Sequence, residues 1–310
     1  MQAVHKDFGF PASGGAGSIY AQGWMPQDAA QVRGIFQIAH GMAEHSARYA
    51  DFARFLCTQG FAVFASDHAG HGKSAAAPAQ FGIFGKNGCA GVVEDCKTLT
   101  ELAKAEYPGK PVIFFGHSMG SFLARKYVMQ YAQGLSGAVF CGTSAANPAA
   151  GVGTLLAKLL AKQKGAESRS TFLHKMAFGA YNKKIQSPRT PNDWLTRDEA
   201  IVDAYQADEA CGFVFTAEAF REMFMLLQEV CRPDAIAALP KRLPLLLISG
   251  EDDPVGGYGK GIRKLEGQIR AAGHPALTAI LYPDDRHEIL NELDKETVYQ
   301  NIADWALQQI

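Results

Sequence analysis

The fold of this chain is decided by residues 111–120, PVIFFGHSMG. The apolar run Val112–Phe115 predicts a buried strand, and the helix-period stretch Phe122–Ala132 follows the motif G-x-S-x-G. The motif alone is weak, because a chain with 32 glycines in 310 residues contains about 0.14 such matches by chance. A strand, a sharp turn and a helix are, however, the setting of a nucleophile elbow, and Gly116 and Gly120 leave room for the turn. The segment therefore predicts that Ser118 is presented as a nucleophile.

Ser118 also has a purely local interpretation. In a glycine-rich turn between a strand and a helix, a serine often serves as the N-cap of the helix. A nucleophile needs in addition a general base, a group that orients the base, and donors for the oxyanion. The chain offers a candidate for each, and this favours catalysis over capping.

His287 is the predicted base. It lies after the last apolar run and before the C-terminal helical stretch, and loops at the carboxyl ends of parallel strands gather at one edge of a sheet. The orienting carboxylate is expected in Gly250–Val255 (GEDDPV), which also follows an apolar run. Asp253 is preferred because the proline after it favours an extended conformation, and Asp252 is the alternative. The order Ser118, Asp253, His287 is that of α/β-hydrolases.

Two backbone N–H groups are needed to stabilise the oxyanion of a tetrahedral intermediate. One is expected from the residue after the nucleophile, Met119. The second is expected from a loop after an early strand, and Met42 in His40-Gly41-Met42 occupies such a loop. An ordinary turn at His40 and Gly41 is the alternative interpretation.

Short apolar runs alternate with helix-period stretches along much of the chain. The apolar runs are Gly34–Ala39, Phe61–Ala65, Pro111–Phe115, Gly137–Cys141, Leu243–Ser249 and Ala276–Tyr282. The amphipathic stretches are Ala47–Gln59, Val92–Tyr107, Met119–Ala132, Lys260–Ala272 and Lys295–Gln309. This alternation predicts an α/β fold in which helices cover both faces of a mostly parallel sheet.

The alternation breaks between residues 144 and 239. This interval contains only helical patterns, in Thr154–Lys164, Thr171–Tyr181, Thr196–Asp208 and Ala217–Val230. Strand patterns resume after it, so an insertion is favoured over a second autonomous domain. We expect residues 1–143 and 240–310 to form one α/β-hydrolase core, and residues 144–239 to form an inserted helical cap.

Composition excludes several classes of protein. A hydrophobic share of 47% and a charged share of 20% are ordinary for a globular chain and exclude disordered and collagen-like sequences. Lys+Arg 30 and Asp+Glu 31 nearly cancel, so there is no electrostatic reason to bind nucleic acid. We expect no nucleic-acid partner, and the sequence does not predict an oligomeric state.

The six cysteines stand without short paired spacings, which argues against a disulfide framework or a zinc site. Met1–Met25 lacks an apolar segment behind a basic start. An apolar run of about 20 residues, long enough to span a bilayer, does not occur in the sequence. The expectations are a cytoplasmic protein with reduced thiols, no metal and no cofactor.

Five segments carry recognisable motifs: His40–Tyr49 (HGMAEHSARY), Asp67–Ser74 (DHAGHGKS), Gly116–Gly120 (GHSMG), Gly250–Val255 (GEDDPV) and Arg286–Glu292 (RHEILNE). Together they resemble the serine hydrolases of the α/β-hydrolase fold that include monoacylglycerol lipases and bacterial lysophospholipases. The resemblance covers nearly the whole chain outside the cap. It implies Ser118 as nucleophile with Asp253 and His287 as partners, implies the same two oxyanion donors, and favours Asp253 over Asp252.

Substrate selectivity is expected from the cap. One of its helical stretches carries an apolar stripe, which either packs against the core or forms a lid that lines an acyl tunnel or touches a lipid aggregate. Later phenylalanines offer further apolar lining for an alkyl chain. The predicted acyl-chain lining is Leu155, Leu156, Leu159, Leu160, Phe213, Phe215, Phe220 and Phe224.

These features predict a serine carboxylic-ester hydrolase that cleaves a single-acyl lipid, with monoacylglycerol as the first candidate, through an acyl-enzyme. The expected partner is thus a small-molecule lipid ester, and the lid interpretation adds transient contact of the cap with lipid aggregates or a membrane surface. A lysophospholipase or general carboxylesterase is an alternative, because the sequence does not specify the leaving group. An acyltransferase and a non-catalytic binding protein are further alternatives.

Overall fold

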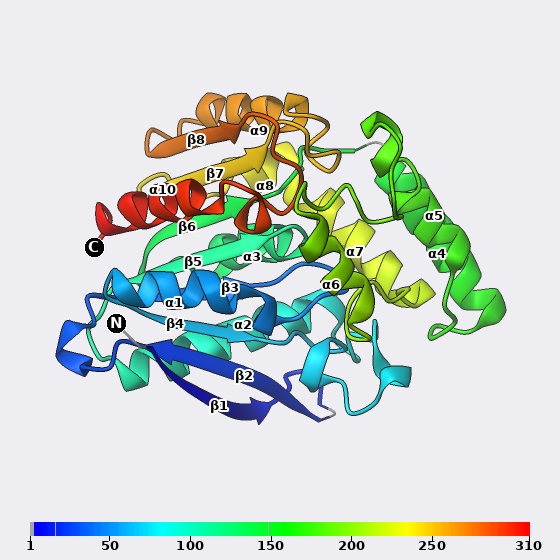
Figure 1. The fold of residues 1–310 in the computed structure, drawn as a ribbon. Helices are drawn as coiled ribbons and strands as arrows, with labels where there is room; N and C mark the ends of the chain where they lie inside the picture. Colours follow the sequence, from blue (N-terminus) through cyan, green and yellow to red (C-terminus); the bar gives the residue numbers. More distant parts are fainter. Residues whose placement is uncertain (1–2, 16, 148) are drawn as a thin grey trace.

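The computed structural model describes residues 3–15, 17–147 and 149–310, and an eight-stranded sheet forms its centre (Figure 1). In spatial order the strands are β1 Val4–Pro11, β2 Ser18–Met25, β4 Phe61–Ser66, β3 Gly34–Ala39, β5 Val112–His117, β6 Leu135–Cys141, β7 Leu245–Gly250 and β8 Leu277–Tyr282. β2 runs antiparallel to β1 and β4, and the other neighbouring pairs are parallel. The predicted α/β class with a mostly parallel sheet is confirmed.

The six predicted apolar runs all form strands, with ends that differ by at most two residues from those predicted. β3, β4, β5 and β7 are buried along their whole length. A strand that is covered on both faces buries every side chain and therefore appears as a continuous apolar run. In β5, Phe114 packs on one face and Phe115 on the other, because successive side chains of a strand alternate.

Strands β1 and β2 form a hairpin at one edge of the sheet, and the sequence pattern predicts neither. β1 carries polar residues such as Lys6 and Asp7 and is largely exposed. β2 buries Gln22, whose side-chain amide donates to the Ser46 hydroxyl at 2.7 Å. β1 is exposed and needs no continuous apolar run, whereas β2 is buried from Ala21 to Met25 but is interrupted by Gln22 and Gly23. A hydrophobic search therefore passes over both strands.

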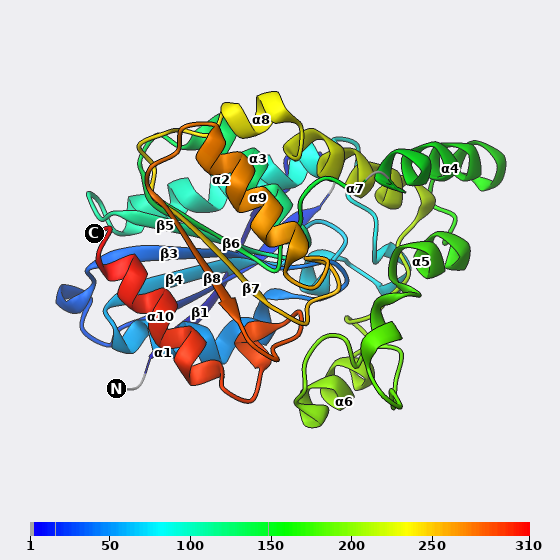
Figure 2. The same cartoon turned by 90° about the horizontal axis from the view of Figure 1, so that it is seen from above.

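Helices cover both faces of the sheet (Figure 2). α1 Ala50–Thr58 and α10 Lys295–Leu307 pack on one face, and α2 Gly88–Glu106, α3 Met119–Tyr131 and α9 Lys260–Ala271 pack on the other. These are the five predicted amphipathic stretches. The first of them differs from the prediction because it opens with a separate 3₁₀ turn, Ser46–Tyr49, before α1 begins. Within the described ranges, no helix combines the length and apolar character needed to cross a lipid bilayer.

We use the name cap segment for residues 144–239, which connect β6 to β7. Its helices are α4 Ala149–Lys164, α5 Thr171–Phe178, α6 Glu199–Ala207, α7 Ala217–Val230 and α8 Pro233–Ala237. α4, α5 and α6 lie beyond the carboxyl ends of the strands (Figure 1), while α8 lies close to α9. In the described part of the cap segment, no residue joins the central sheet.

The four predicted helical stretches of the cap segment all occur as helices, α7 with the predicted ends and the other three with changed ends. α5 is shorter than predicted, because the chain leaves the α-helix after Phe178 and forms a 3₁₀ turn at Tyr181–Lys184. α6 begins at Glu199, since the Asp198 side chain caps it by accepting from the next backbone N–H groups. The division of the chain into a hydrolase core and an inserted cap stays a prediction.

Candidate active site

Ser118 occupies the turn between β5 and α3. Its backbone has φ 54° and ψ −121°, a strained conformation for a residue with a side chain. The backbone N–H donates to the Cys141 carbonyl at 2.9 Å, which ties the turn to β6. Ser118 stands at the N-cap position of α3, but its hydroxyl makes no capping hydrogen bond with the described residues. The geometry therefore does not support the local capping role.

Two glycines make the turn sterically feasible. A Cβ on Gly116 would collide with the carbonyl oxygen of Gly120, and a Cβ on Gly120 would collide with that of Ala39, at the end of β3. This close approach brings the loop after β3 against the turn, where a Cβ on Gly41 would lie 3.1 Å from the Ser118 Cβ. The loop predicted to supply an oxyanion donor thus lies directly beside Ser118.

His287 and Asp253 meet at the carboxyl ends of β8 and β7. His287 Nδ1 lies 3.0 Å from Asp253 Oδ2, at ion-pair distance, and among the described residues Nδ1 has no partner that meets hydrogen-bond geometry. Asp253 is fully buried and is held by the Ser249 hydroxyl at 3.1 Å and the Val255 N–H at 2.8 Å. Asp252, the alternative orienter, is exposed.

The charge state of His287 is controlled by its neighbours. Burial by itself lowers the pKa of this imidazole, but the nearby carboxylates of Asp253, Glu288 and Glu44 outweigh burial, so the pKa is raised. The ring of His117 lies 4.7 Å away, measured between ring centroids. Burial and the neighbouring His287 lower the pKa of His117 to about 3, which keeps His117 neutral at ordinary pH.

The loop predicted to supply the second oxyanion donor, residues 40–44 and called the oxyanion loop below, is held from several sides. The Gly41 N–H donates to Glu44 Oε1 at 2.6 Å. Ala43 has a positive φ of 54°, and its carbonyl accepts from the Gly212 N–H at 2.9 Å and the Tyr205 hydroxyl at 3.0 Å. The backbone of Met42, between these anchors, is therefore restrained by contacts with the cap segment. Sequence patterns do not indicate these contacts, since Gly212 and Tyr205 lie far away in the chain.

Buried histidines hold the oxyanion loop through hydrogen bonds. His40 Nδ1 lies 2.8 Å from the Gly41 carbonyl, and His40 Nε2 accepts the His68 N–H at 2.9 Å. One ring nitrogen thus donates and the other accepts, which requires the neutral imidazole. Burial lowers the pKa of His68 to about 4 and that of His71 to about 3. The motif DHAGHGKS is accordingly a support for the loop.

Arg48 connects the oxyanion loop to the loop of His287. Its guanidinium donates to Glu44 at 2.6 Å and to both carboxylate oxygens of Glu288 at 2.7 Å. Burial alone would raise the pKa of Glu288, but the Arg48 charge lowers it to about 2. The motif segments contain all three residues, yet only the folded chain brings Glu288 to Arg48.

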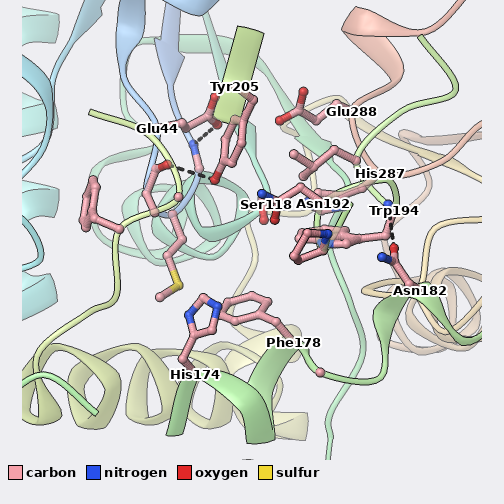
Figure 3. A pocket seen from close by; sticks show the side chains of 18 of the residues that line it. Glu44, Ser118, His174, Phe178, Asn182, Asn192, Trp194, Tyr205, His287 and Glu288 are labelled. Carbon is pink, nitrogen blue, oxygen red and sulfur yellow. Dashed lines mark hydrogen bonds between the residues drawn. The ribbon is translucent and has the colours of Figure 1, made fainter. Parts of the chain in front are cut away.

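Two cavities meet at Ser118. The first has a volume of about 260 Å³ and contains both Ser118 and His287 in its wall (Figure 3). Its polar lining includes Glu44, Asn192 and Glu288. The second has a volume of about 120 Å³ and a mainly apolar wall. That wall consists of Met42, Ser118, Met119, Phe122, Ser144, Asn147, Ala149, Ala150, Met176, Ala177, Phe178, Tyr181, Met223, Phe224, Leu227 and Val255.

The predicted phenylalanine lining is divided by the structure. Phe213 lines the first cavity and Phe224 lines the second. Phe215 and Phe220 are fully buried in the core beside α2 and α3 instead. As defined by the described residues, neither cavity includes these two side chains, so their prediction as acyl lining is not supported.

The leucine stripe of α4 is also divided. Leu156 and Leu160 pack inward against the core, whereas 58% of Leu155 and 46% of Leu159 are exposed. Four residues at this spacing cover about 140° of a helix, with Leu155 and Leu159 toward one edge of the stripe and Leu156 and Leu160 toward the other. Within the described residues none of the four lines either cavity. The prediction that these four leucines line the acyl site is therefore wrong. Leu156 and Leu160 pack against the core, and Leu155 and Leu159 are exposed.

Two groups of side chains have the composition of a metal site: His45, Asp208 and Cys211, and Asp285, Glu292 and Asp294. In the first group His45 already pairs with Asp208 at 2.8 Å. In the second group the Arg197 guanidinium pairs with the three carboxylates. Charge partners within the protein therefore account for both groups.

A serine in a strained turn after the central strand of a mostly parallel sheet, beside an aspartate–histidine pair, defines a hydrolase of the α/β-hydrolase fold. The family model described as serine aminopeptidase, S33, matches residues 30–294. The chain belongs to this family.

Known proteins resemble the chain over its full length. A monoacylglycerol lipase of Mycolicibacterium smegmatis is 28% identical over 100% of both chains, and the monoglyceride lipase of Homo sapiens is 27% identical over 94% of this chain and 87% of its own. A carboxyl esterase from Bacillus coagulans, solved in complex with glycerol, is 31% identical and superposes with a TM-score of 0.92 over 98% of each chain. Family and relatives together identify the chain as a carboxylic ester hydrolase that resembles monoacylglycerol lipases.

Proposed function

We propose that this enzyme hydrolyses single-acyl lipid esters, monoacylglycerols above all, with Ser118 as nucleophile, His287 as base and Asp253 as the group that orients the base. The main support is the 3.0 Å contact between His287 Nδ1 and Asp253 Oδ2, at a cavity that Ser118 also lines. Similarity to two monoacylglycerol lipases, and to an esterase that binds glycerol, supports a glyceryl ester as substrate.

The reaction follows from these roles. His287 accepts the hydroxyl proton of Ser118 while Oγ attacks the ester carbonyl, and the backbone N–H groups of Met42 and Met119 stabilise the oxyanion. The tetrahedral intermediate collapses, the bond to the alcohol oxygen breaks, and His287 returns the proton to the departing alcohol. Water then attacks the acyl-enzyme with His287 again as base, which releases the fatty acid and restores Ser118.

The two cavities suggest where each part of the ester lies. The leaving alcohol must face His287, because this residue protonates it, and His287 lines the first cavity. We therefore assign the alcohol to the first cavity, whose lining includes Glu44, Asn192 and Glu288. The acyl chain is assigned to the second, apolar cavity, which begins at Ser118 and Met119.

Cavity size limits the acyl chain. The second cavity is smaller than the first, at about 120 Å³ against about 260 Å³. Acyl chains that outgrow it require α4 and α5 to move away from α7. Ala150→Leu, which narrows this cavity, should therefore reduce hydrolysis of longer acyl esters more than that of acetates, whereas the exposed Ala76→Leu should change neither.

The decisive experiment is a comparison of hydrolysis rates for monoacylglycerol, lysophosphatidylcholine and simple carboxylic esters, with Ser118→Ala and His287→Ala as controls. We expect monoacylglycerol to be the best substrate and both variants to lose nearly all activity while remaining folded. A Ser118→Ala variant that keeps half of the wild-type rate would refute the assignment of the nucleophile. Faster cleavage of lysophosphatidylcholine would make the enzyme a lysophospholipase.

Two further alternatives are separated by product analysis. An acyltransferase would pass the acyl group to a competing alcohol, so ester products would accumulate when glycerol is added. A non-catalytic binding protein would not react with a fluorophosphonate probe at Ser118. We expect probe labelling and free fatty acid as the main product.

The cap segment is proposed to act as a lid that touches lipid. Its arm, α4 and α5, exposes Val152, Leu155, Leu159, Phe172 and Met176, and Lys158 and Lys162 lie on the same arm. Such a surface suits transient contact with a lipid aggregate. The helical cap on one hydrolase core, and the cytoplasmic location suggested by the cysteine pattern, belong to the same proposal.

A further inference from the structure

The ring of His287 packs near two other rings. One belongs to His117, from the turn of Ser118, and the other belongs to Trp194, from the cap segment. The centroid of the His287 ring lies 4.7 Å from that of His117 and 5.0 Å from that of Trp194. Only 2% of His287 is exposed, and these two rings contribute to that burial.

The backbone beside Trp194 is attached to the loop of His287. The His287 N–H donates to the Trp194 carbonyl at 3.4 Å, and the Glu288 N–H donates to the Leu195 carbonyl at 2.7 Å. Arg286 adds side-chain hydrogen bonds to the carbonyls of this segment at 2.7 and 3.0 Å. Hydrogen bonds therefore connect the segment of Trp194 to the loop of His287 at His287 itself and at the residues directly before and after it.

Trp194 is itself held in place within the cap segment. Its backbone N–H donates to Asn182 Oδ1 at 2.9 Å, and the Asn182 amide donates to the Thr190 carbonyl at 2.7 Å. The indole ring packs on Tyr181, with centroids 4.8 Å apart, and on Phe178, with centroids 6.1 Å apart. The indole therefore has one defined position over His287.

We propose that Trp194 is a positioning residue for the reaction, which acts on His287 by covering its ring and stabilising the imidazolium that forms during proton transfer. This inference rests on the proposed function of His287 as base. An aromatic face within about 6 Å of a cation attracts it, and His287 becomes a cation only as the tetrahedral species form and break down. An interaction that is stronger in the transition state than in the ground state raises kcat.

The test compares Trp194→Phe and Trp194→Leu in the full-length enzyme. Leu keeps an apolar cover without an aromatic face, and Phe keeps a weaker aromatic face. We expect kcat to fall in the order Trp, Phe, Leu, with a loss of about 3- to 30-fold for Leu. The KM for a small ester should change little. The acid limb of the kcat/KM profile should shift to lower pH by about 0.5 to 1 unit in Trp194→Leu.

Trp305→Leu is the matched control, because Trp305 is buried in α10 and packs against Gly137 of β6, in a different core cluster from Trp194. It should lower the unfolding temperature but leave the pH profile of the folded enzyme unchanged. The inference would be overturned if Trp194→Leu kept the kcat and the pH profile of the wild type. It would also be overturned if Trp194→Phe and Trp194→Leu lost the same share of kcat. Activity retained by His287→Ala would instead overturn the proposed function, so the two failures are distinguishable.

Discussion

Arg48 donates two hydrogen bonds, each 2.7 Å long, to the two carboxylate oxygens of Glu288. The same guanidinium donates to Glu44, which accepts the backbone N–H of Gly41. Since Glu288 follows His287 directly, one buried ion network joins the proposed base to the proposed oxyanion loop. A bidentate pair also fixes the orientation of both groups, so a change at Arg48 should affect both sides of the site.

Replacing Arg48 by Met leaves two buried carboxylates without their cation. Removal of one partner from a buried ion pair costs roughly 3–5 kcal/mol in free energy of unfolding. We expect a loss of this size in urea denaturation. Arg54→Met is the matched control, because Arg54 and its partner Asp51 are exposed, and it should change stability by only about 0.5 kcal/mol. Equal losses of unfolding free energy in the two variants would show that the buried network of Arg48 contributes no more to stability than an exposed ion pair.

Glu288→Gln should move the acid limb of the kcat/KM profile to lower pH. The base must be neutral to accept the proton of Ser118, and the Glu288 charge is one of the carboxylates that raise the pKa of His287. Removing this charge lowers the pKa of His287, so the neutral form persists further into the acid range. Arg48 keeps its partner Glu44 in this variant. The control is Glu266→Gln, on α9, which should leave the pH profile in place. A shift of the acid limb to higher pH in Glu288→Gln would contradict the electrostatic assignment.

Asp253→Asn and Asp252→Asn should differ sharply in activity. Asp253 is buried against His287, whereas Asp252 is exposed. An asparagine at the orienting position favours the wrong tautomer of the base, and this costs about 10⁴-fold in kcat. Asp252→Asn should remain within about twofold of wild type, in line with surface substitutions. Steady-state rates on a soluble ester measure both, and comparable losses would reopen the choice of orienter.

Asp285→Asn should gain stability relative to wild type as the pH rises. Burial, together with Glu292 and Asp294, raises the pKa of Asp285 to about 8 against the effect of Arg197. The folded protein thus holds a proton that the unfolded chain releases above about pH 4. The resulting stabilisation is complete at low pH and is lost as the pH rises through about 8. Asparagine stays neutral and can still accept from Arg197.

Denaturant unfolding of this variant and of wild type, at about pH 5 and about pH 9, measures the effect. The stability difference should favour Asp285→Asn more strongly at the higher pH. For Asp252→Asn, which alters an exposed carboxylate, the difference from wild type should be the same at both values. A difference for Asp285→Asn that does not depend on pH would mean that this carboxyl is already ionised in the folded protein.

Local sequence was sufficient for the central strands and for the turn at Ser118. A strand that is buried on both faces must be apolar throughout, and a strained turn between backbones in contact must contain glycine, so both features leave a signal within a few residues. The hairpin of β1 and β2 leaves no comparable signal, because β1 is largely exposed and the buried part of β2 contains Gln22 and Gly23. Ser118, Asp253 and His287 could be predicted as site residues for the same reason, because each lies in the segment that follows an apolar run.

The amino-acid sequence by itself determined the fold class, six of the eight strands of the sheet and the segments that surround the site. Only the tertiary structure decided which residues of those segments meet: Arg48 with Glu288, Trp194 with His287, and Phe224 but not Phe220 with a cavity. It also decided that Leu156 packs inward while Leu155 faces outward. The physical reason is that periodicity describes one helix or strand at a time, whereas burial, charge and access at a site depend on distant segments that fold against each other.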